Sequence, residues 1–381
     1  MGCTDSDIAR DACMLDGKFA GKGYDWWWHS FTAKDAQTGE ERPFFVEFFL
    51  CNPALAKDEP TFGLAADGTR PSDDAHRPSY LMVKAGTWGG DARQLHRFFP
   101  WKDVEVSKGA PFFVRADDCL CCETDLVGRV EVSPEDAQAH PEWMSDAGSI
   151  LFDLRLDKQV AFNVGYGASG RMRAAKAFDM FWHAEGVKTL VEGSVWLDGR
   201  KYVVEPGTSF GYADKNWGCD FTSPWVWLST WDLVSRKTGE RLANSALEIG
   251  GGRPVVANVA LERKLLGCMV HEGRAFEFNF SKPWTGSKTR FNGYETDDSV
   301  VWHVDLQTRE ARLIVDVSCD KSEMLLMNYE SPDGRQRHDR LWNGGAGTGR
   351  VQLYERREGV WQLVDDMDAA HIGCEYGEYG A

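Results

Sequence analysis

The chain has 381 residues, of which 43% are hydrophobic and 27% charged, the composition of a folded globular protein with one large or two ordinary domains. Its 59 acidic and 43 basic residues give a formal charge of −16, which repels nucleic-acid phosphates and anionic membranes. Composition therefore argues against nucleic acid as a partner. The 16 tryptophans and 21 phenylalanines favour an apolar or sugar-like ligand in addition to a large core.

No apolar run reaches the ~18–20 residues of a membrane helix, and the N-terminus lacks the pattern of a secretion signal. We therefore expect a cytoplasmic protein without a transmembrane segment and with reduced cysteines. The opening MGCTDS has the spacing for N-myristoylation at Gly2, although its acidic residues oppose binding to an anionic membrane. The cysteines of segment 119–122 have no second Cys or His pair at matching spacing. We expect them on a strand and expect no metal site.

The elements predicted in chain order are mostly short strands separated by turns. Segments 25–33 (DWWWHSFTA) and 43–50 (PFFVEFFL) are rich in aromatic residues and flank a polar turn, which predicts a hairpin. One short helix is expected within 133–144, where a Ser-Pro-Glu-Asp sequence caps the start, and 171–178 is a second candidate. Further strands are expected at 79–84, 111–115, 128–132, 150–156, 160–164 and 188–196.

This strand pattern occurs twice in the chain. Segment 223–249 repeats the pattern of segment 25–49, with Trp-x-Trp-x-Ser in the first strand and Thr-Gly-Glu in the turn. The hairpins at 186–206 and 349–366 also correspond. Each is followed by a stretch, expected to be a loop, that is rich in Gly, Tyr and acid: GYADKNWG (211–218) and GCEYGEYG (373–380). A period of about 200 residues is too long for a solenoid, so we predict two antiparallel β-domains, 1–220 and 221–381, each a barrel or sandwich.

The stretch SFGYADKNWGCDFTSPWVWLS (209–229) resembles the signature of the tocopherol cyclase family, a Gly-Tyr-acid-Lys-Asn-Trp-Gly run followed by a Trp-rich strand. More broadly, the layout is similar to that of tandem lipocalin-like proteins, which include carotenoid hydratases and pericyclases. The resemblance implies an all-β chain of two tandem lipocalin-like antiparallel barrel or sandwich domains. It also implies a pocket between them for a hydrophobic substrate and cofactor-free protonation, hydration, cyclisation or isomerisation. Asp214 stands where the family pattern has Glu, which shortens the reach of the acid by one carbon.

The GYADKNWG motif has the residue types for protonating an alkene or enol ether. Burial raises a carboxyl pKa, and indole faces stabilise a developing carbocation. Asp214 is the candidate acid. Lys215 lowers its pKa unless it points to the opposite face, and Asn216 is a candidate to orient a substrate oxygen or a water. In the alternative interpretation the motif is a domain junction, in which Asp and Asn cap a turn and Trp217 plugs the mouth of the first barrel.

Other candidate acids and bases lie outside this motif. Glu47 stands among large apolar residues, where burial would raise its pKa, and His29 flanks the first Trp cluster; a water-facing or purely structural position is the alternative for each. His183 lies in a segment expected to be a loop at the pocket rim, and Glu375 in an acidic tail expected to fray or dock. The candidate substrate-binding residues are Trp26, Trp28, His183, Tyr212, Trp217, Trp225 and Trp227.

These observations predict a cofactor-independent cyclase, hydratase or isomerase that uses acid catalysis on a hydrophobic, prenyl- or polyene-like small molecule. Two other functions fit the composition. A glycoside-active or sugar-binding β-protein would use Trp platforms and carboxylates, and a carrier would bind an apolar ligand without chemistry. The segment GAGTGR (345–350) is not followed by a helical pattern and does not predict a phosphate site. A homo-oligomer is compatible with the sequence.

Overall fold

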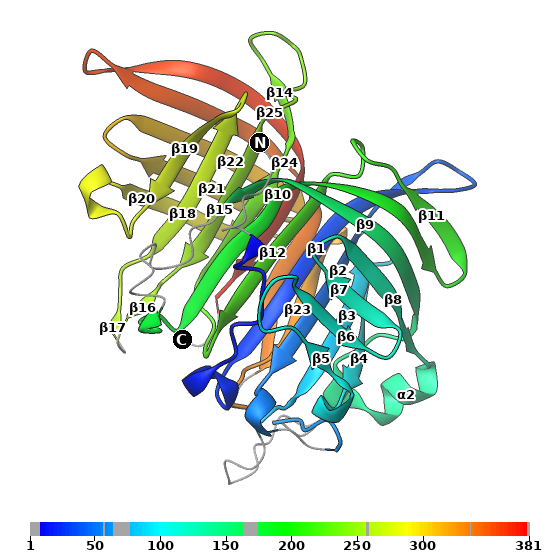
Figure 1. The fold of residues 1–381 in the computed structure, drawn as a ribbon. Helices are drawn as coiled ribbons and strands as arrows, with labels where there is room; N and C mark the ends of the chain where they lie inside the picture. The colour runs from blue at the N-terminus through cyan, green and yellow to red at the C-terminus, as the bar shows by residue number, and fades with distance from the viewer. Residues whose placement is uncertain are drawn as a thin grey trace.

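The computed structural model describes residues 8–55, 58–63, 77–162, 174–256, 259–335 and 337–378. Two large antiparallel sheets follow one another along the chain and lie against each other (Figure 1). The predicted all-β fold class with antiparallel sheets is confirmed. The candidate myristoylation site lies outside the described residues. In that described part, no helix has both the length and the apolar character needed to cross a membrane.

The first sheet has twelve strands in the order β4-β3-β2-β1-β11-β10-β9-β8-β7-β6-β5, and β12 pairs with both β1 and β10. It curls until β4 meets β8, where Arg97 Nη1 donates to the Arg129 carbonyl at 3.1 Å. Its strands are β1 Tyr24–Asp35, β2 Glu41–Cys51, β3 Tyr80–Thr87, β4 Arg93–Phe99, β5 Glu105–Val106, β6 Phe113–Ala116, β7 Cys119–Cys122, β8 Asp125–Val132, β9 Gly148–Phe162, β10 Met180–Leu197, β11 Arg200–Val204 and β12 Gly211–Gly218.

The second sheet has eleven strands in the order β19-β18-β15-β13-β25-β24-β22-β21-β20; β14 pairs with β25, and β23 with β24. Its strands are β13 Trp225–Thr230, β14 Asp232–Ser235, β15 Ala246–Gly252, β18 Lys264–His271, β19 Arg274–Asn279, β20 Lys288–Glu295, β21 Ser299–Gln307, β22 Ala311–Asp320, β23 Met324–Glu330, β24 Arg337–Arg357 and β25 Val360–Gly377. A separate two-stranded ribbon joins β16 Val255–Val256 and β17 Val259–Ala260.

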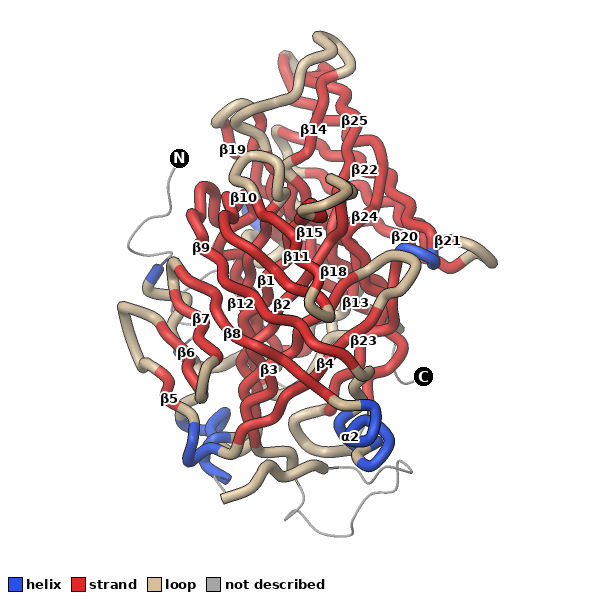
Figure 2. The backbone as a smooth tube through the Cα atoms, turned by 90° about the vertical axis from the view of Figure 1, so that its right-hand side faces the viewer, coloured by secondary structure: helices blue, strands red, loops and turns tan. Residues whose placement is uncertain are grey.

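Among the described residues, helices are few and short (Figure 2). The predicted capped helix is α2, Pro134–Ala139, where the Ser133 side chain accepts from the backbone N–H of Asp136. Of the second predicted helix, 171–173 lie outside the described residues, 174 is helical and 175–176 form a turn. Single 3₁₀ turns are η1 Gly17–Ala20, η2 Pro53–Leu55, η4 Trp101–Asp103, η5 Pro141–Trp143, η6 Pro283–Thr285 and η7 Lys321–Glu323.

Three hydrophobic cores account for the aromatic content. One fills the concave side of the first sheet and contains Trp27, and another fills the second sheet and contains Leu228. The third lies between the two sheets and contains Trp28 and Trp227, the sequence neighbours of those two residues. Successive side chains of a strand point to opposite faces, so β1 and β13 each serve two cores. A strand that is buried on both faces carries a continuous apolar run instead of alternating apolar and polar side chains. This explains the three consecutive tryptophans in β1.

Several predicted boundaries and loops are wrong. The strands expected at 150–156 and 160–164 are one strand, β9. The segment around His183, expected to be a loop, lies inside β10. GYADKNWG, also expected to be a loop, is the fully buried strand β12, and the expected acidic tail forms the end of β25 as far as Gly377. In β10 and β12 the polar side chains pack into a core, so their polarity wrongly suggested exposure.

Candidate active site

Four carboxyl groups, of which three are buried and Glu375 is half-buried, lie within the core between the sheets, which we call the inter-sheet core. Glu47 and Asp214 come from the first sheet, and Glu248 and Glu375 come from the second. Strand pairing places Asp214 opposite Trp28, Trp28 opposite Glu47, and Glu47 opposite Lys84. Directly paired residues share a face, so these four side chains form one row across the first sheet. The row faces the second sheet.

Asp214 is anchored through one carboxyl oxygen. Its Oδ2 accepts hydrogen bonds from Trp182 Nε1 at 2.9 Å and from the Tyr212 hydroxyl at 3.1 Å. Its Oδ1 is buried and has no hydrogen-bond partner in the described part of the chain. Burial raises the pKa of Asp214 to about 8, and the two hydrogen bonds only partly oppose that shift. Asp214 is therefore protonated at neutral pH, and because both donors occupy Oδ2, its proton belongs on Oδ1.

A hydrogen-bond network connects Asp214 to Glu248. The Tyr212 hydroxyl lies 3.1 Å from both Asp214 Oδ2 and Glu248 Oε1, and Trp227 Nε1 donates at 3.1 Å to that hydroxyl and at 3.0 Å to Glu248 Oε1. A hydroxyl has a single proton, so Tyr212 donates to only one of the two carboxyl groups at a time. Burial raises the pKa of Glu248 well above its usual range, which keeps that carboxyl protonated and able to donate to Tyr212.

Glu47 and Lys84 form a buried pair in the same row. Lys84 Nζ lies 3.2 Å from Glu47 Oε2, donates to the Asn328 carbonyl at 3.1 Å, and lies 3.7 Å from the centre of the Tyr329 ring. Both side chains are fully buried. Burial raises the pKa of Glu47 and lowers that of Lys84, so the surroundings favour the uncharged form of each, while their mutual attraction favours the ion pair.

Glu375 is held through both of its carboxyl oxygens. Trp225 Nε1 donates to Oε2 at 2.5 Å, and Asn343 Nδ2 donates to Oε1 at 2.5 Å. Burial raises its pKa to about 7, against these two hydrogen bonds, which lower it. Glu375 also lines a cavity of about 20 Å³, space for about one water. The other lining residues are Trp26, Met180, Phe221, Thr222, Trp225, Tyr329, His338 and Leu341.

Other hollows lie elsewhere. A second cavity of about 20 Å³ lies at another part of the core and is lined in part by Trp88, Tyr212, Trp227 and Trp231. Two larger hollows of about 470 and 550 Å³ border the first sheet and have mainly polar and charged linings. None of the four carboxyl groups of the inter-sheet core lines either of them. The larger hollows have the volume of a ligand site but lack its apolar lining, so we place the candidate site in the inter-sheet core.

The GYADKNWG motif is divided between two faces of β12. Tyr212 and Asp214 face the inter-sheet core, whereas Lys215 points to the concave side of the first sheet, where it pairs with Asp25 and lies 4.0 Å from the Trp27 ring centre. Lys215 therefore does not pair with Asp214. Asn216 is buried and accepts from the Tyr24 hydroxyl at 2.9 Å. Trp217 belongs to the inter-sheet core, where it stacks on Phe181 with ring centres 5.4 Å apart.

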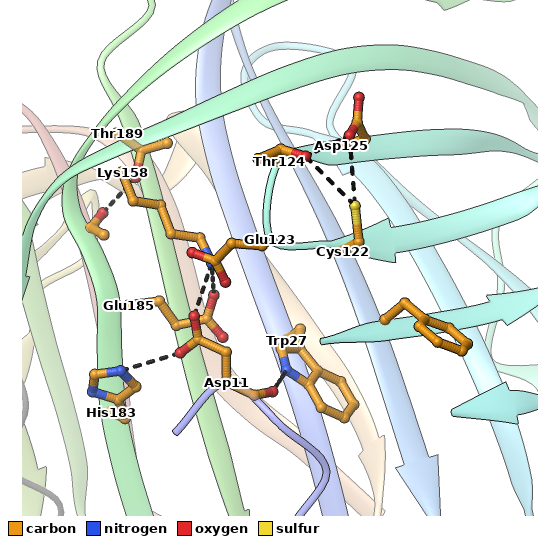
Figure 3. A network of polar contacts seen from close by, with 12 residues as sticks. Asp11, Trp27, Cys122, Glu123, Thr124, Asp125, Lys158, His183, Glu185 and Thr189 are labelled. Atoms are coloured by element: carbon orange, nitrogen blue, oxygen red, sulfur yellow. Dashed lines mark hydrogen bonds and ion pairs between the residues drawn. The ribbon is translucent and has the colours of Figure 1, made fainter. Parts of the chain in front are cut away.

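One of the two histidine candidates, His183, belongs to a separate buried cluster (Figure 3). His183 Nε2 lies 3.2 Å from Asp11 Oδ1, and Lys158 Nζ lies 3.1 Å from Asp11 Oδ2, 3.1 Å from Glu123 and 2.7 Å from Glu185. His29 is buried on the same side of the first sheet, and burial lowers its pKa to about 3, so it is neutral. This cluster joins the N-terminal segment to β9 and β10, and it is not part of the inter-sheet core.

Sequence reasoning identified only part of the constellation. The predicted residues that do contribute to the inter-sheet core are Trp26, Trp28, Trp217, Trp225 and Trp227, together with Glu47, Asp214 and Tyr212. It missed Lys84, Trp182 and Tyr329 as members and assigned no role to Glu248. The internal repeat could have indicated the two acids of the second sheet. Glu248 lies near the position that corresponds to Glu47 in the first repeat, and Glu375 near the position that corresponds to Asp214. No local pattern marks Lys84 or Trp182.

No family model matches this sequence, and no curated protein matches it. Among solved structures, the chain is similar to a candidate AttH protein from Nitrosomonas europaea, with a TM-score of 0.47 and 14% identity over 97% of this chain and 98% of that chain. It is also similar to CghA, solved with Sch210972, with a TM-score of 0.44 and 11% identity over 95% of this chain and 90% of that chain. Similarity at this level carries no argument about function, which must come from the geometry of this chain.

Proposed function

We propose that this protein is an enzyme that protonates a hydrophobic, prenyl- or polyene-like small molecule in the inter-sheet core and so starts a cyclisation, hydration or isomerisation. One observation carries the proposal: Asp214 is fixed through Oδ2, while its buried Oδ1 has no partner in the described residues. A carboxylic acid kept neutral at neutral pH by an apolar site is the group that such chemistry needs.

In the proposed reaction, the proton on Asp214 Oδ1 adds to a carbon–carbon double bond and leaves a carbocation. The indoles of Trp28 and Trp182 are the nearest candidates to stabilise that charge, because Trp28 is the strand neighbour of Asp214 and Trp182 is its hydrogen-bond donor. The indole N–H of Trp28 also has no partner among the described residues and can bind a substrate oxygen. The proposed chemistry uses no cofactor.

The decisive test is Asp214→Asn. Asn has the shape of a protonated Asp, and its carbonyl oxygen can accept from Trp182 and Tyr212, so we expect the fold to be kept. Turnover of any active compound in a panel of geranylhydroquinone and linear isoprenoid polyenes should fall about 100-fold or more, the usual contribution of a general acid. Products would be identified by chromatography with mass spectrometry.

Asp153→Asn is the matched control, because Asp153 is exposed on β9 and remote from the core. Its turnover should equal that of the wild type. An Asp214→Asn enzyme with wild-type turnover would contradict the proposal. Binding of a panel member with no product formed by the wild type would favour the carrier. The sugar-binding alternative has less support, because Trp28, Trp225 and Trp227 are buried between the sheets and form no open platform.

A further inference from the structure

The two halves of the chain place an acid at equivalent positions of their repeats. Asp214 on β12 pairs with Trp28, and Glu375 on β25 pairs with Trp227. Trp28 and Trp227 occupy the same place in the repeated Trp-x-Trp-x-Ser strand. The two acids are also linked in space, since Tyr212 bonds Asp214 and Trp227, and Trp227 is the strand neighbour of Glu375. The inter-sheet core therefore holds one such acid from each half.

The hydrogen bonds of these two acids differ in a way that separates their chemistry. Both donors of Asp214 bind the same oxygen, which leaves the other oxygen to carry a proton. Glu375 accepts one N–H on each oxygen, an arrangement that stabilises the carboxylate. Both donors are fixed side chains of the second sheet, Trp225 on β13 and Asn343 on β24. The geometry thus favours an acid at Asp214 and a base at Glu375.

Glu375 is also the only one of the four carboxyl groups that lines the cavity of about 20 Å³ bordered by Trp26 and Tyr329. Three aromatic rings on that cavity contact one another: the Trp26 ring centre lies 5.6 Å from that of Tyr329 and 5.8 Å from that of Phe221, and the last two lie 6.0 Å apart. Trp225 adds a fourth ring. Aromatic faces beside a carboxylate form a site for a cation, whether a quaternary ammonium or a carbocation.

We propose that Glu375 is the proton acceptor of this site, so that a proton added to the substrate at Asp214 is balanced by one removed at Glu375, and the product is an isomer of the substrate. This inference rests on the proposed function. It excludes hydration as the outcome and specifies either double-bond migration or ring closure by a hydroxyl group of the substrate itself.

The proposed step is balanced in atoms and charge. The bond from hydrogen to Asp214 Oδ1 breaks, a C–H bond forms, and the alkene becomes a carbocation. Loss of a neighbouring C–H proton to Glu375 forms a new alkene; alternatively, the hydroxyl oxygen attacks the cation and its proton passes to Glu375. Asp214 ends as carboxylate and Glu375 as acid. Transfer of one proton from Glu375 back to Asp214, directly or through water, restores the enzyme.

The first test needs no substrate. Prenyltrimethylammonium mimics the cation, and its binding to the full-length protein can be followed by tryptophan fluorescence. We expect Glu375→Gln to weaken binding about tenfold or more, because a full charge opposite the cation is lost. Asn343 can rotate its amide to suit Gln. Asp153→Asn, which changes an exposed residue of β9, should bind within twofold of the wild type. Equal binding by Glu375→Gln, or no binding by the wild type at millimolar ligand, would overturn the inference.

The second test uses the products of whichever panel compound the wild type converts. An isomer of unchanged mass, formed about 100-fold more slowly by Glu375→Gln, is the expected result. A product heavier by one water, or full turnover by Glu375→Gln, would overturn the inference. The two proposals fail separately: full turnover by Asp214→Asn contradicts the proposed function, whereas full turnover by Glu375→Gln with an inactive Asp214→Asn contradicts only this inference.

Discussion

At the scale of single residues, the inter-sheet core holds carboxyl groups that would be more stable in water. Burial raises the pKa of Asp214 to about 8 and that of Glu375 to about 7. Such a shift opposes folding wherever the unfolded chain releases the proton and the folded chain retains it. Functional sites commonly carry this kind of stability cost, and replacing the functional group often removes it.

Asp214→Asn should therefore stabilise the protein. The folded chain holds the Asp214 proton up to a pKa of about 8, whereas the unfolded value is near 3.8. Between these values the wild type loses stability as the pH rises, and the variant, which does not titrate, avoids this loss. Its advantage should be absent near about pH 4 and grow to at most about 5 kcal/mol by about pH 8. Thermal unfolding across this range measures it, and parallel curves would contradict the assigned protonation.

We make a different prediction for the Glu47–Lys84 pair, because each group neutralises the charge of the other. Lys84→Met leaves Glu47 buried without its cation and should lower the free energy of unfolding by about 3 kcal/mol. Adding Glu47→Gln should recover most of this loss. A double-mutant cycle in urea gives the coupling energy. Additive effects of the two changes would show that the pair is not energetically coupled.

At the scale of elements, glycines allow the two sheets to approach. Gly250 on β15 of the second sheet faces Trp182 on β10 of the first; a Cβ atom there would lie 3.1–3.3 Å from three carbons of the indole ring. Trp182 in turn holds Asp214. The packing of the two sheets at Gly250 therefore affects the position of the Asp214 carboxyl group.

Gly250→Ala should therefore weaken both the packing between the two sheets and the hydrogen bond that positions Asp214. We expect a loss of about 1–3 kcal/mol in the free energy of unfolding from overpacking, together with reduced turnover as the Trp182 hydrogen bond to Asp214 loosens. Gly90→Ala is the control, since a Cβ atom at Gly90 meets nothing within 4 Å. Chemical denaturation compares the two variants. Equal stability of both would mean that the interface adapts to the added methyl group.

The elements also show which parts of the structure were predictable. The hairpin of β1 and β2 and the repeat at β13 and β15 were visible, because aromatic runs and turn residues mark them. The strands β12 and the first half of β10 were not, because they carry polar residues on faces buried in one of two cores. Cross-strand pairing, such as that of Asp214 with Trp28, depends on register, and the sequence shows register only through the internal repeat.

At the scale of the whole molecule, the inter-sheet core makes each sheet dependent on the other. Without the second sheet, the first would expose Trp28, Phe45, Phe49 and Tyr80, all of which are buried in the chain. A boundary near residue 220 remains a prediction, and it separates the two sheets along the chain. An exposed aromatic surface of this kind favours aggregation.

The intact chain should therefore unfold in one cooperative transition, and the segment 1–220 expressed alone should be insoluble or poorly folded. Differential scanning calorimetry tests the first expectation by comparing the calorimetric with the van't Hoff enthalpy. Two separate transitions, or a soluble and folded 1–220 fragment, would contradict it. The two sheets would then be independent folding units, and the core between them a secondary contact.

The cavity beside Glu375 is much smaller than the ~300–1,000 Å³ of typical ligand sites. A prenyl chain can enter only after side chains or whole sheets have moved apart. Opening of the protein should therefore limit the rate of ligand binding. At high ligand concentration, the observed association rate should level off at the frequency of this opening, and solvents of higher viscosity should slow it. Once closed around the substrate, the core would shield a short-lived carbocation from bulk water. Slow ligand entry would thus accompany better control over which product the carbocation forms.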